Sequence, residues 1–118
     1  MRRALLAEGL GAMLLTAAVI GSGIMAERLA GGNLAVALIA NTGATVAVLA
    51  TLIALLGPVS GAHFNPAVSF IEALRGNLGV RAAIAYALVQ ILARVYRVRG
   101  GNSNLTLVFC GKGRCRSV

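Results

Sequence analysis

No residue between Arg28 and Glu72 carries a formal charge, which leaves 43 consecutive uncharged residues in a chain of 118. A single helix needs about 20 apolar residues to cross the hydrocarbon core of a bilayer. Hydrophobic residues make up 58% of the chain and charged residues only 12%, whereas soluble domains carry about 25% charged residues. The sequence therefore predicts one domain of an all-α membrane protein rather than a soluble globule.

Two segments are long and apolar enough to span a bilayer. The first, at about residues 4–26, follows Arg2 and Arg3 and contains one charge, Glu8. A cleaved signal peptide is the alternative for this segment, but its length and the internal glutamate favour a transmembrane helix. The second, residues 34–56, is rich in Ala, Gly and Thr, which allow helices to approach closely in lipid.

The stretch GPVSGAHFNPAVS at residues 57–69 contains both prolines and the only histidine of the chain. Asn65 is a favourable N-cap residue and Pro66 suits the first helical position. We expect a helix from Pro66 to about Leu74, nine residues or about 13 Å long, against a hydrocarbon core of roughly 30 Å. Residues 57–75 are therefore predicted to form a re-entrant loop and half-helix, with the positive end of the helix dipole at mid-depth.

The last predicted helix covers about residues 80–95. Its uncharged core, residues 82–93, lies between Arg81 and Arg94 and reaches only about 18 Å, which is short for a span. Snorkelling of the flanking arginines can lengthen it. The fold prediction is thus two to three transmembrane helices plus one half-helix.

The remaining residues, 94–118, differ in composition from the apolar body. Residues 1–93 contain five arginines and three glutamates, a net charge of +2, whereas residues 94–118 contain six basic and no acidic residues, a net charge of +6. A solvated tail is favoured over a surface for nucleic acid or anionic lipid, because the segment has no nucleic-acid-binding motif. The spacing of Cys110 and Cys115 does not suit a zinc site and leaves a disulfide open. We hypothesise that this segment is coding sequence read in a shifted frame.

The segment SGAHFNPAVS, residues 60–69, resembles the first signature loop of the aquaporin (major intrinsic protein) family. Glu8 with Gly9 and Gly11 resembles the opening helix of that family, and Tyr86 and Gln90 resemble the start of its third helix. The resemblance covers about residues 1–93 and implies an aquaporin-like N-terminal half. The family fold consists of two inverted repeats whose half-helices meet at the membrane centre.

The resemblance also implies roles for single residues. Asn65 would donate its side-chain amide to the permeating molecule, Val68 would narrow the pore beside it, and buried Glu8 would accept hydrogen bonds from the loop. The backbone carbonyls of the loop would form a ladder of acceptors. The residues assigned to the pore wall in this way are Gly61, Ala62, His63, Asn65, Pro66, Ala67 and Val68.

Each of these assignments has a plainer alternative. Asn65 with Pro66 can be only a capped turn, His63 can be a packing residue, and Glu8 can be an interfacial charge. Counting back from the loop, the family's selectivity position in the second helix falls near Thr45. Water-selective members carry an aromatic residue there, so a threonine suggests a wider opening, suited to polyols or neutral metalloid hydroxides.

The function expected from the resemblance is passive transport of water or small neutral solutes by a multi-pass protein of the plasma (inner) membrane. The sequence carries no second Asn-Pro-Ala, so the chain would be incomplete alone and would need a second half-channel or another copy of itself. The alternative is a truncated, transport-inactive membrane protein. No catalytic set of serine, histidine and acid and no phosphate-binding loop occurs, and we expect no enzyme activity, cofactor, metal or nucleic-acid partner.

Overall fold

The structure is a computed structural model that describes residues 1–109, with the side chains of residues 1–99. This part of the chain contains four α-helices and no strand, which confirms the all-α prediction. The helices are α1 (Arg2–Leu29), α2 (Leu34–Ser60), α3 (Pro66–Leu74) and α4 (Val80–Phe109). The short helix α3 has the range that the sequence predicts for the half-helix.

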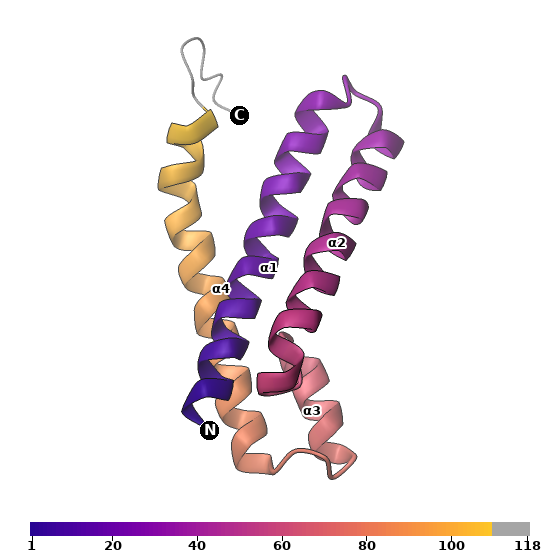
Figure 1. The fold of residues 1–118 in the computed structure, drawn as a ribbon. Helices are drawn as coiled ribbons and strands as arrows, with labels where there is room; N and C mark the ends of the chain where they lie inside the picture. Colours follow the sequence, from indigo (N-terminus) through magenta and orange to yellow (C-terminus); the bar gives the residue numbers. More distant parts are fainter. Residues whose placement is uncertain (110–118) are drawn as a thin grey trace.

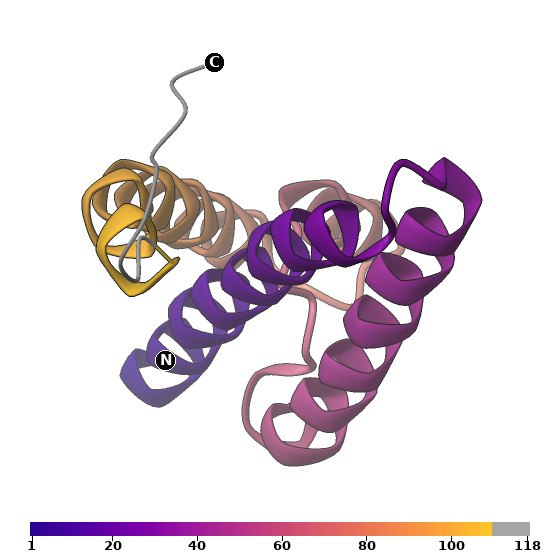
Figure 2. The ribbon, with the colours of Figure 1, turned by 90° about the horizontal axis from the view of Figure 1, so that it is seen from above.

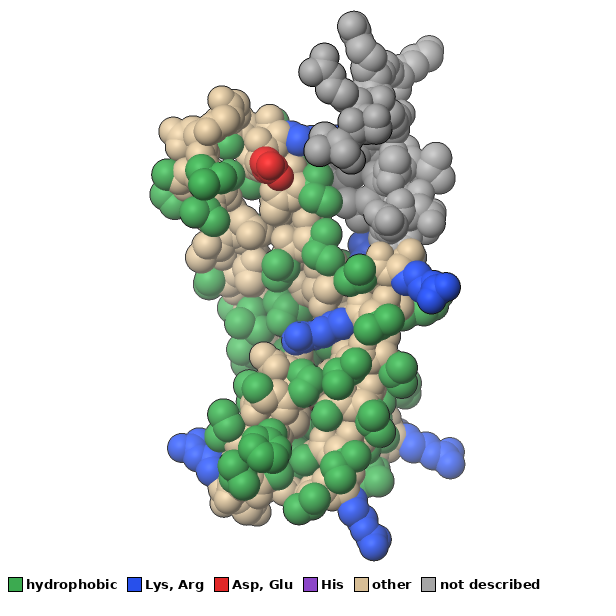
Figure 3. Space-filling model, turned by 180° about the vertical axis from the view of Figure 1, so that it is seen from behind, with side chains coloured by type: hydrophobic (Ala, Val, Ile, Leu, Met, Phe, Trp, Pro, Cys, Tyr) green, Lys and Arg blue, Asp and Glu red, His purple; other side chains and the backbone are tan. Residues whose placement is uncertain are grey.

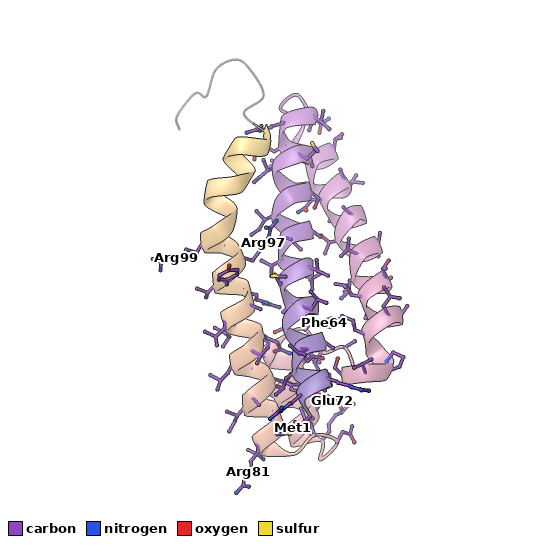
Figure 4. The ribbon with its side chains drawn as sticks, turned by 60° about the vertical axis from the view of Figure 1, so that its left-hand side comes forward. Met1, Phe64, Glu72, Arg81, Arg97 and Arg99 are labelled. Carbon is purple, nitrogen blue, oxygen red and sulfur yellow. The ribbon has the colours of Figure 1, made fainter. Side chains whose placement is uncertain are left out.

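The three long helices lie side by side, with α1 between α2 and α4 (Figures 1 and 2). α1 and α2 form an antiparallel hairpin, and α3 packs against α4 near the end of the bundle where the chain starts. Met1, Glu72 and Arg81 lie at this same end, as Figure 4 shows. The α1–α2 turn lies at the opposite end.

α1 and α2 are the two described helices that are long and apolar enough to cross a membrane, judged by length and composition. Only 22% of the most apolar stretch of α1 and 6% of that of α2 is buried inside the structure. A core helix of a soluble protein would be mostly buried, and large exposed apolar surfaces indicate contact with lipid or other protein. Figure 3 shows hydrophobic side chains spread over much of one face of the bundle.

α2 is longer than the sequence predicts, because it continues from residue 56 through Pro58 to Ser60. Proline disfavours helical backbone at the preceding residue mainly through a clash with that residue's Cβ and N–H. Here the preceding residue is Gly57, which has no Cβ. The helix ends at Gly61, whose φ of +86° is left-handed and whose N–H donates to the Gly57 carbonyl at 2.9 Å. The predicted start of the loop at residue 57 is therefore wrong, and the loop begins at Gly61.

α4 is also longer than predicted, since it ends at Phe109 rather than near residue 95. The change in composition at Arg94 therefore does not coincide with a break in the helix. The segment that follows contains no proline, the residue that most strongly interrupts a helix. Cys110 and Cys115 lie outside the described residues.

The turn after α3 is closed by local polar contacts. Asn77 Nδ2 donates to Glu72 Oε2 at 2.8 Å, and Arg75 forms an ion pair with Glu72 at 3.4 Å. The hydrogen bond from Asn77 is the main cause that holds the pKa of the Glu72 carboxyl below its ordinary value. These contacts fix the reversal that brings α4 back along the half-helix.

Two glycines of α1 allow close contacts with its neighbours. A Cβ at Gly9 would lie 2.7 Å from Val89 Cγ1 of α4, and a Cβ at Gly11 would lie 2.1–2.9 Å from the ring of Phe64. Real Cβ atoms are not found so close to other heavy atoms. Both neighbours therefore pack directly against the backbone of α1.

We predict that Gly11→Ala destabilises the bundle because its methyl group would overlap the buried Phe64 ring. Overpacking costs about 1–3 kcal/mol, which exceeds the gain of up to about 1 kcal/mol from replacing a helical glycine by alanine. The measurement is the thermal midpoint of the purified chain in micelles, followed by size-exclusion chromatography of heated samples. Gly21→Ala is the control, since nothing lies within 4 Å of its Cβ position. Equal midpoints for the two variants would contradict the close contact.

Candidate functional site

The loop between α2 and α3 has a backbone conformation that local sequence does not favour. Ala62 and Phe64 have φ values of +54° and +46°, in the left-handed region, although neither is a glycine. Such conformations cost of order 1–3 kcal/mol each and persist only where the surroundings enforce them. The contacts around this loop must therefore supply that energy.

Glu8 of α1 provides the central contact. Its side chain is fully buried, and its carboxylate oxygens accept hydrogen bonds from His63 N at 3.0 Å and Phe64 N at 2.7 Å. Gln90 Nε2 of α4 donates to the same carboxylate at 2.7 Å. Hydrogen bonds to an ionised acceptor are stronger than those between neutral groups. One carboxylate thus joins α1, the loop and α4.

α4 supplies further contacts from successive turns. Tyr86 OH donates to the Ser60 carbonyl at 3.4 Å, and Gln90 Nε2 also contacts Ser69 Oγ of α3 at 3.3 Å. Arg94 Nη2 donates to the Phe64 carbonyl at 2.7 Å. We call Glu8, Phe64, Ser69, Gln90 and Arg94 the loop cluster.

Two polar atoms of the loop cluster have no hydrogen-bond partner among the described residues, namely Gln90 Oε1 and Arg94 Nε. Both belong to α4 and are four residues apart, so they project from the same side of the helix. A buried polar atom left unpaired costs roughly 1–3 kcal/mol. The cluster therefore holds the loop at some cost to the stability of α4 packing.

Phe64 is the apolar anchor of the loop. It is 1% exposed, and its ring lies against the backbone of α1 at Gly11. Figure 4 shows it beside α1, in the half of the bundle nearer Met1. Ring burial and two backbone hydrogen bonds therefore act on a single residue, directly before Asn65.

The N–H partners of the loop also decide where its carbonyls point. In a trans peptide the N–H and C=O groups point in opposite directions. Ala62 N donates to Ser60 Oγ at 3.2 Å, while the next two N–H groups donate to Glu8. The carbonyls of Gly61, Ala62 and His63 consequently point away from these acceptors. None of the three accepts a hydrogen bond from the described part of the chain, whereas Ser60 O and Phe64 O on either side do.

Asn65 caps α3. Its Oδ1 accepts a hydrogen bond from Ala67 N at 3.1 Å, and the residue is exposed. The oxygen is used by the cap, whereas the donor nitrogen Nδ2 has no hydrogen-bond partner among the described residues. The capped-turn alternative and a donor role for Asn65 are thus compatible.

The other predicted site residues lie around this loop, with one exception. The half-buried His63 ring lies 5.7 Å from the Tyr86 ring between centroids, and its Nδ1 is 3.4 Å from Ser69 Oγ. Val68 on α3 is 40% exposed. Thr45 lies instead within α2, 15 residues or about 22 Å of helix before Ser60, and its hydroxyl donates to the Asn41 carbonyl at 2.8 Å.

Sequence reasoning did not assign site roles to three members of the loop cluster. Phe64 lies inside the signature segment without an assigned role, Gln90 enters only through the family resemblance, and Arg94 belongs to the predicted tail. Ser69 is expected from the sequence only to cap or hydrogen-bond the loop. Buried contacts between distant segments leave no local pattern, so spacing alone could not reveal them. The one available signal was that Gln90 and Arg94 are four residues apart, on one face of a helix.

The sequence model of the major intrinsic protein family matches residues 1–98. The chain belongs to the major intrinsic protein family. The match extends beyond residue 93, where the expected resemblance stopped, and includes Arg94. No solved structure matches the chain significantly.

Individual major intrinsic proteins agree with this assignment. The chain is 53% identical to the aquaglyceroporin AqpS of Rhizobium meliloti (strain 1021) over 93 residues, which cover 79% of this chain and 40% of that protein. It is 38% identical to the lens fiber major intrinsic protein of Gallus gallus over 90 residues, covering 76% of this chain and 32% of that protein. The chain thus spans less than half the length of the curated relatives it matches.

We predict that Glu8→Gln destabilises the loop. An amide presents one oxygen and one NH₂ group, so at least one of the three donors around it would lose its acceptor. Each buried donor left unpaired costs roughly 1–3 kcal/mol. The measurement is amide hydrogen exchange of the peptide containing His63 and Phe64, in bilayers, where we expect faster exchange. Glu27→Gln, an exposed glutamate of the same helix, should leave that exchange unchanged. Exchange at the wild-type rate in Glu8→Gln would show that the carboxylate does not hold the loop.

Proposed function

We propose that this chain forms part of a membrane channel for passive transport of water or small neutral solutes such as glycerol or metalloid hydroxides. The chain would provide one half of the pore, with the residues Gly61, Ala62, His63, Asn65, Pro66, Ala67 and Val68 in its wall. Membership of the major intrinsic protein family and the aquaglyceroporin relative support this class of function. The proposed location is the plasma (inner) membrane, with more than one pass.

The row of three unpaired carbonyls carries the proposal. Unsatisfied backbone groups in hydrocarbon cost several kcal/mol each, so irregular backbone at membrane depth occurs only inside protein or beside a wet cavity. In this loop every N–H from Ala62 to Phe64 has a protein acceptor, while the carbonyls of Gly61, Ala62 and His63 have no donor among the described residues. A file of hydrogen-bonding molecules passing along the loop would supply the missing donors.

The electrostatics at Asn65 suit a neutral permeant. The side chain offers its Nδ2 donor next to the acceptor row, and α3 begins at the following residue. The N-terminus of a helix carries partial positive charge, which repels cations and disfavours proton passage while affecting a neutral molecule little. The small Thr45 favours a polyol or metalloid hydroxide over water alone, as part of the same proposal.

A second half is needed to close the pore. The acceptor row and Asn65 occupy one wall, and α3 is the one half-helix of the described residues. The exposed apolar side chains on α3, among them Val68, Phe70 and Ile71, are free to contact a second half or lipid. We therefore expect little or no transport by this chain alone, and a second half-channel or another copy as its partner. A transport-inactive fragment is the alternative function.

We predict that Asn65→Ala lowers permeability in a complete channel. Residues 1–93 would be joined to the remainder of the Rhizobium meliloti aquaglyceroporin, and glycerol and water flux measured by light scattering of proteoliposomes. Loss of the central donor should reduce the flux towards the lipid background, with protein insertion unchanged. Asn33→Ala is the matched control, since Asn33 also caps a helix by accepting from Val36 N at 3.3 Å, but lies in the α1–α2 turn. Undiminished flux in Asn65→Ala would remove Asn65 from the pore.

We predict that α4 spans the membrane poorly and leaves much of the basic tail on the cytoplasmic side. Arg2 and Arg3 start α1, Arg81 lies at the same end of the bundle as Met1 and Glu72, and Arg75 pairs with Glu72. The positive-inside rule places this excess of basic residues in the cytoplasm. Although α4 has 30 residues, or about 45 Å, spanning would carry most of the tail's basic side chains to the outer side.

Labelling of Cys110 and Cys115 with a membrane-impermeant maleimide in right-side-out vesicles measures this topology. We expect labelling mainly after the vesicles are opened. A variant carrying one added cysteine in the α1–α2 turn, with Cys110 and Cys115 replaced by serine, serves as the external control. Predominant labelling of the tail in intact vesicles would show that α4 crosses and would weaken the expectation of inactivity.

A further inference from the structure

We propose that Arg94 is a positioning residue for Asn65, acting by holding the peptide bond between Phe64 and Asn65. Its Nη2 donates to the Phe64 carbonyl at 2.7 Å, from a helix that meets the loop 30 residues later in the sequence. Family membership and the proposed channel function do not assign this residue a role. Its relevance to permeation rests on the proposed function, but the contact itself does not.

The hydrogen bond from Arg94 acts on the peptide unit that determines the orientation of Asn65. The Phe64 carbonyl and the Asn65 N–H belong to the same planar peptide unit, so the direction of one fixes the direction of the other. Asn65 follows with φ −145° and ψ 129°, and its Oδ1 then caps α3. Rotation of this peptide plane would turn the Asn65 side chain and the first turn of the half-helix together.

Arg94 and Glu8 hold Phe64 from its two sides. The carboxylate accepts from the Phe64 N–H at 2.7 Å, and the guanidinium donates to the Phe64 carbonyl at 2.7 Å. Phe64 has left-handed φ, so its two flanking peptides need opposing restraints to stay in place. The negative and positive groups also act on one residue in an environment where an isolated charge is costly.

The guanidinium is suited to this contact in a way that lysine is not. A planar guanidinium donates in fixed directions, and the nitrogen Nε of Arg94 is buried, which limits the rotation of the group. A lysine ammonium can donate to one carbonyl but holds no fixed plane. We therefore expect Arg94→Lys to keep the contact in part and Arg94→Ala to abolish it.

The test is nuclear magnetic resonance of the full chain in lipid bilayers with pairwise labels. Phe64–Asn65 is the single Phe–Asn pair of the sequence, so ¹³C-carbonyl phenylalanine with ¹⁵N asparagine gives one correlation for this peptide. Loss of the guanidinium in Arg94→Ala should shift the Phe64 carbonyl upfield and move the Asn65 nitrogen. Arg94→Lys should restore part of the carbonyl shift, and Arg97→Ala, which removes an equal charge from the same helix, should leave both resonances in place.

A second correlation separates a local effect from collapse of the loop. His63–Phe64 is also a unique pair, and its peptide N–H is bound by Glu8. This correlation should stay near its wild-type position in Arg94→Ala if Arg94 acts on the following peptide. A Phe64 carbonyl that moves no more in Arg94→Ala than in Arg97→Ala would overturn the proposal.

If Arg94→Ala does not fold, a distance measurement on the chain with its native Arg94 tests the proposal instead. With Phe70 and Phe109 replaced by leucine, Phe64 is the only ¹³C-carbonyl phenylalanine, and guanidino-¹⁵N arginine reports its distance by dipolar dephasing. The 2.7 Å contact and a C=O bond of about 1.23 Å place the two nuclei at most about 4 Å apart. Absence of dephasing at that separation would also overturn the proposal. Neither readout needs transport, so a chain that transports nothing can still pass this test.

Discussion

The buried carboxylate of Glu8 is the contact on which the rest of the site depends. It lies 55 residues before the first loop N–H that it binds, and it accepts from the loop and from α4 at the same time. Without it, the loop around the left-handed residues Ala62 and Phe64 would lose two of its hydrogen bonds, and the N–H groups of His63 and Phe64 would lack acceptors. The close glycine contacts of α1 with Phe64 and Val89 bring that carboxylate within reach.

The hydrogen bonds to Glu8 also determine which side of the loop carries its unpaired carbonyl groups. Since the N–H groups of Ala62, His63 and Phe64 are turned toward Ser60 or Glu8, the carbonyls on the other side of those peptides must face away. A row of acceptors therefore arises from the need to satisfy donors, and no polar side chain has to be placed along it. Asn65 adds the complementary donor because capping α3 uses its oxygen and leaves its nitrogen.

The sequence predicts those parts of the molecule that are determined locally. α3 was predicted with its observed range because an Asn-Pro start and a Gly-Asn end are strong local signals. The end of α2 is not predicted, because Gly57 relieves the clash that Pro58 would otherwise cause. The extension of α4 is not predicted either, because a change of composition does not interrupt a helix. Within the site, Glu8 and Asn65 could be assigned through family resemblance. The roles of Phe64 and Arg94 depend on packing between distant segments, which no spacing in one sequence encodes.

The packing also makes the geometry of the site depend on the position of α4. α3 contacts α4, and the loop receives hydrogen bonds from Tyr86, Gln90 and Arg94 on successive turns of that helix. A change in the depth or tilt of α4 would therefore move the half-helix and the acceptor row with it.

The basic residues that follow Arg94 oppose transfer of α4 across a bilayer, whereas the hydrogen bonds of Gln90 and Arg94 favour keeping its first turns beside the loop. Both conditions are met if α4 enters the membrane far enough to place Arg94 at the Phe64 carbonyl. The side chains of the remaining arginines must then reach back to a polar surface. The depth at which Arg94 binds the Phe64 carbonyl would then set the depth of Asn65, so in the proposed channel the insertion of α4 and the formation of the pore wall would be one process.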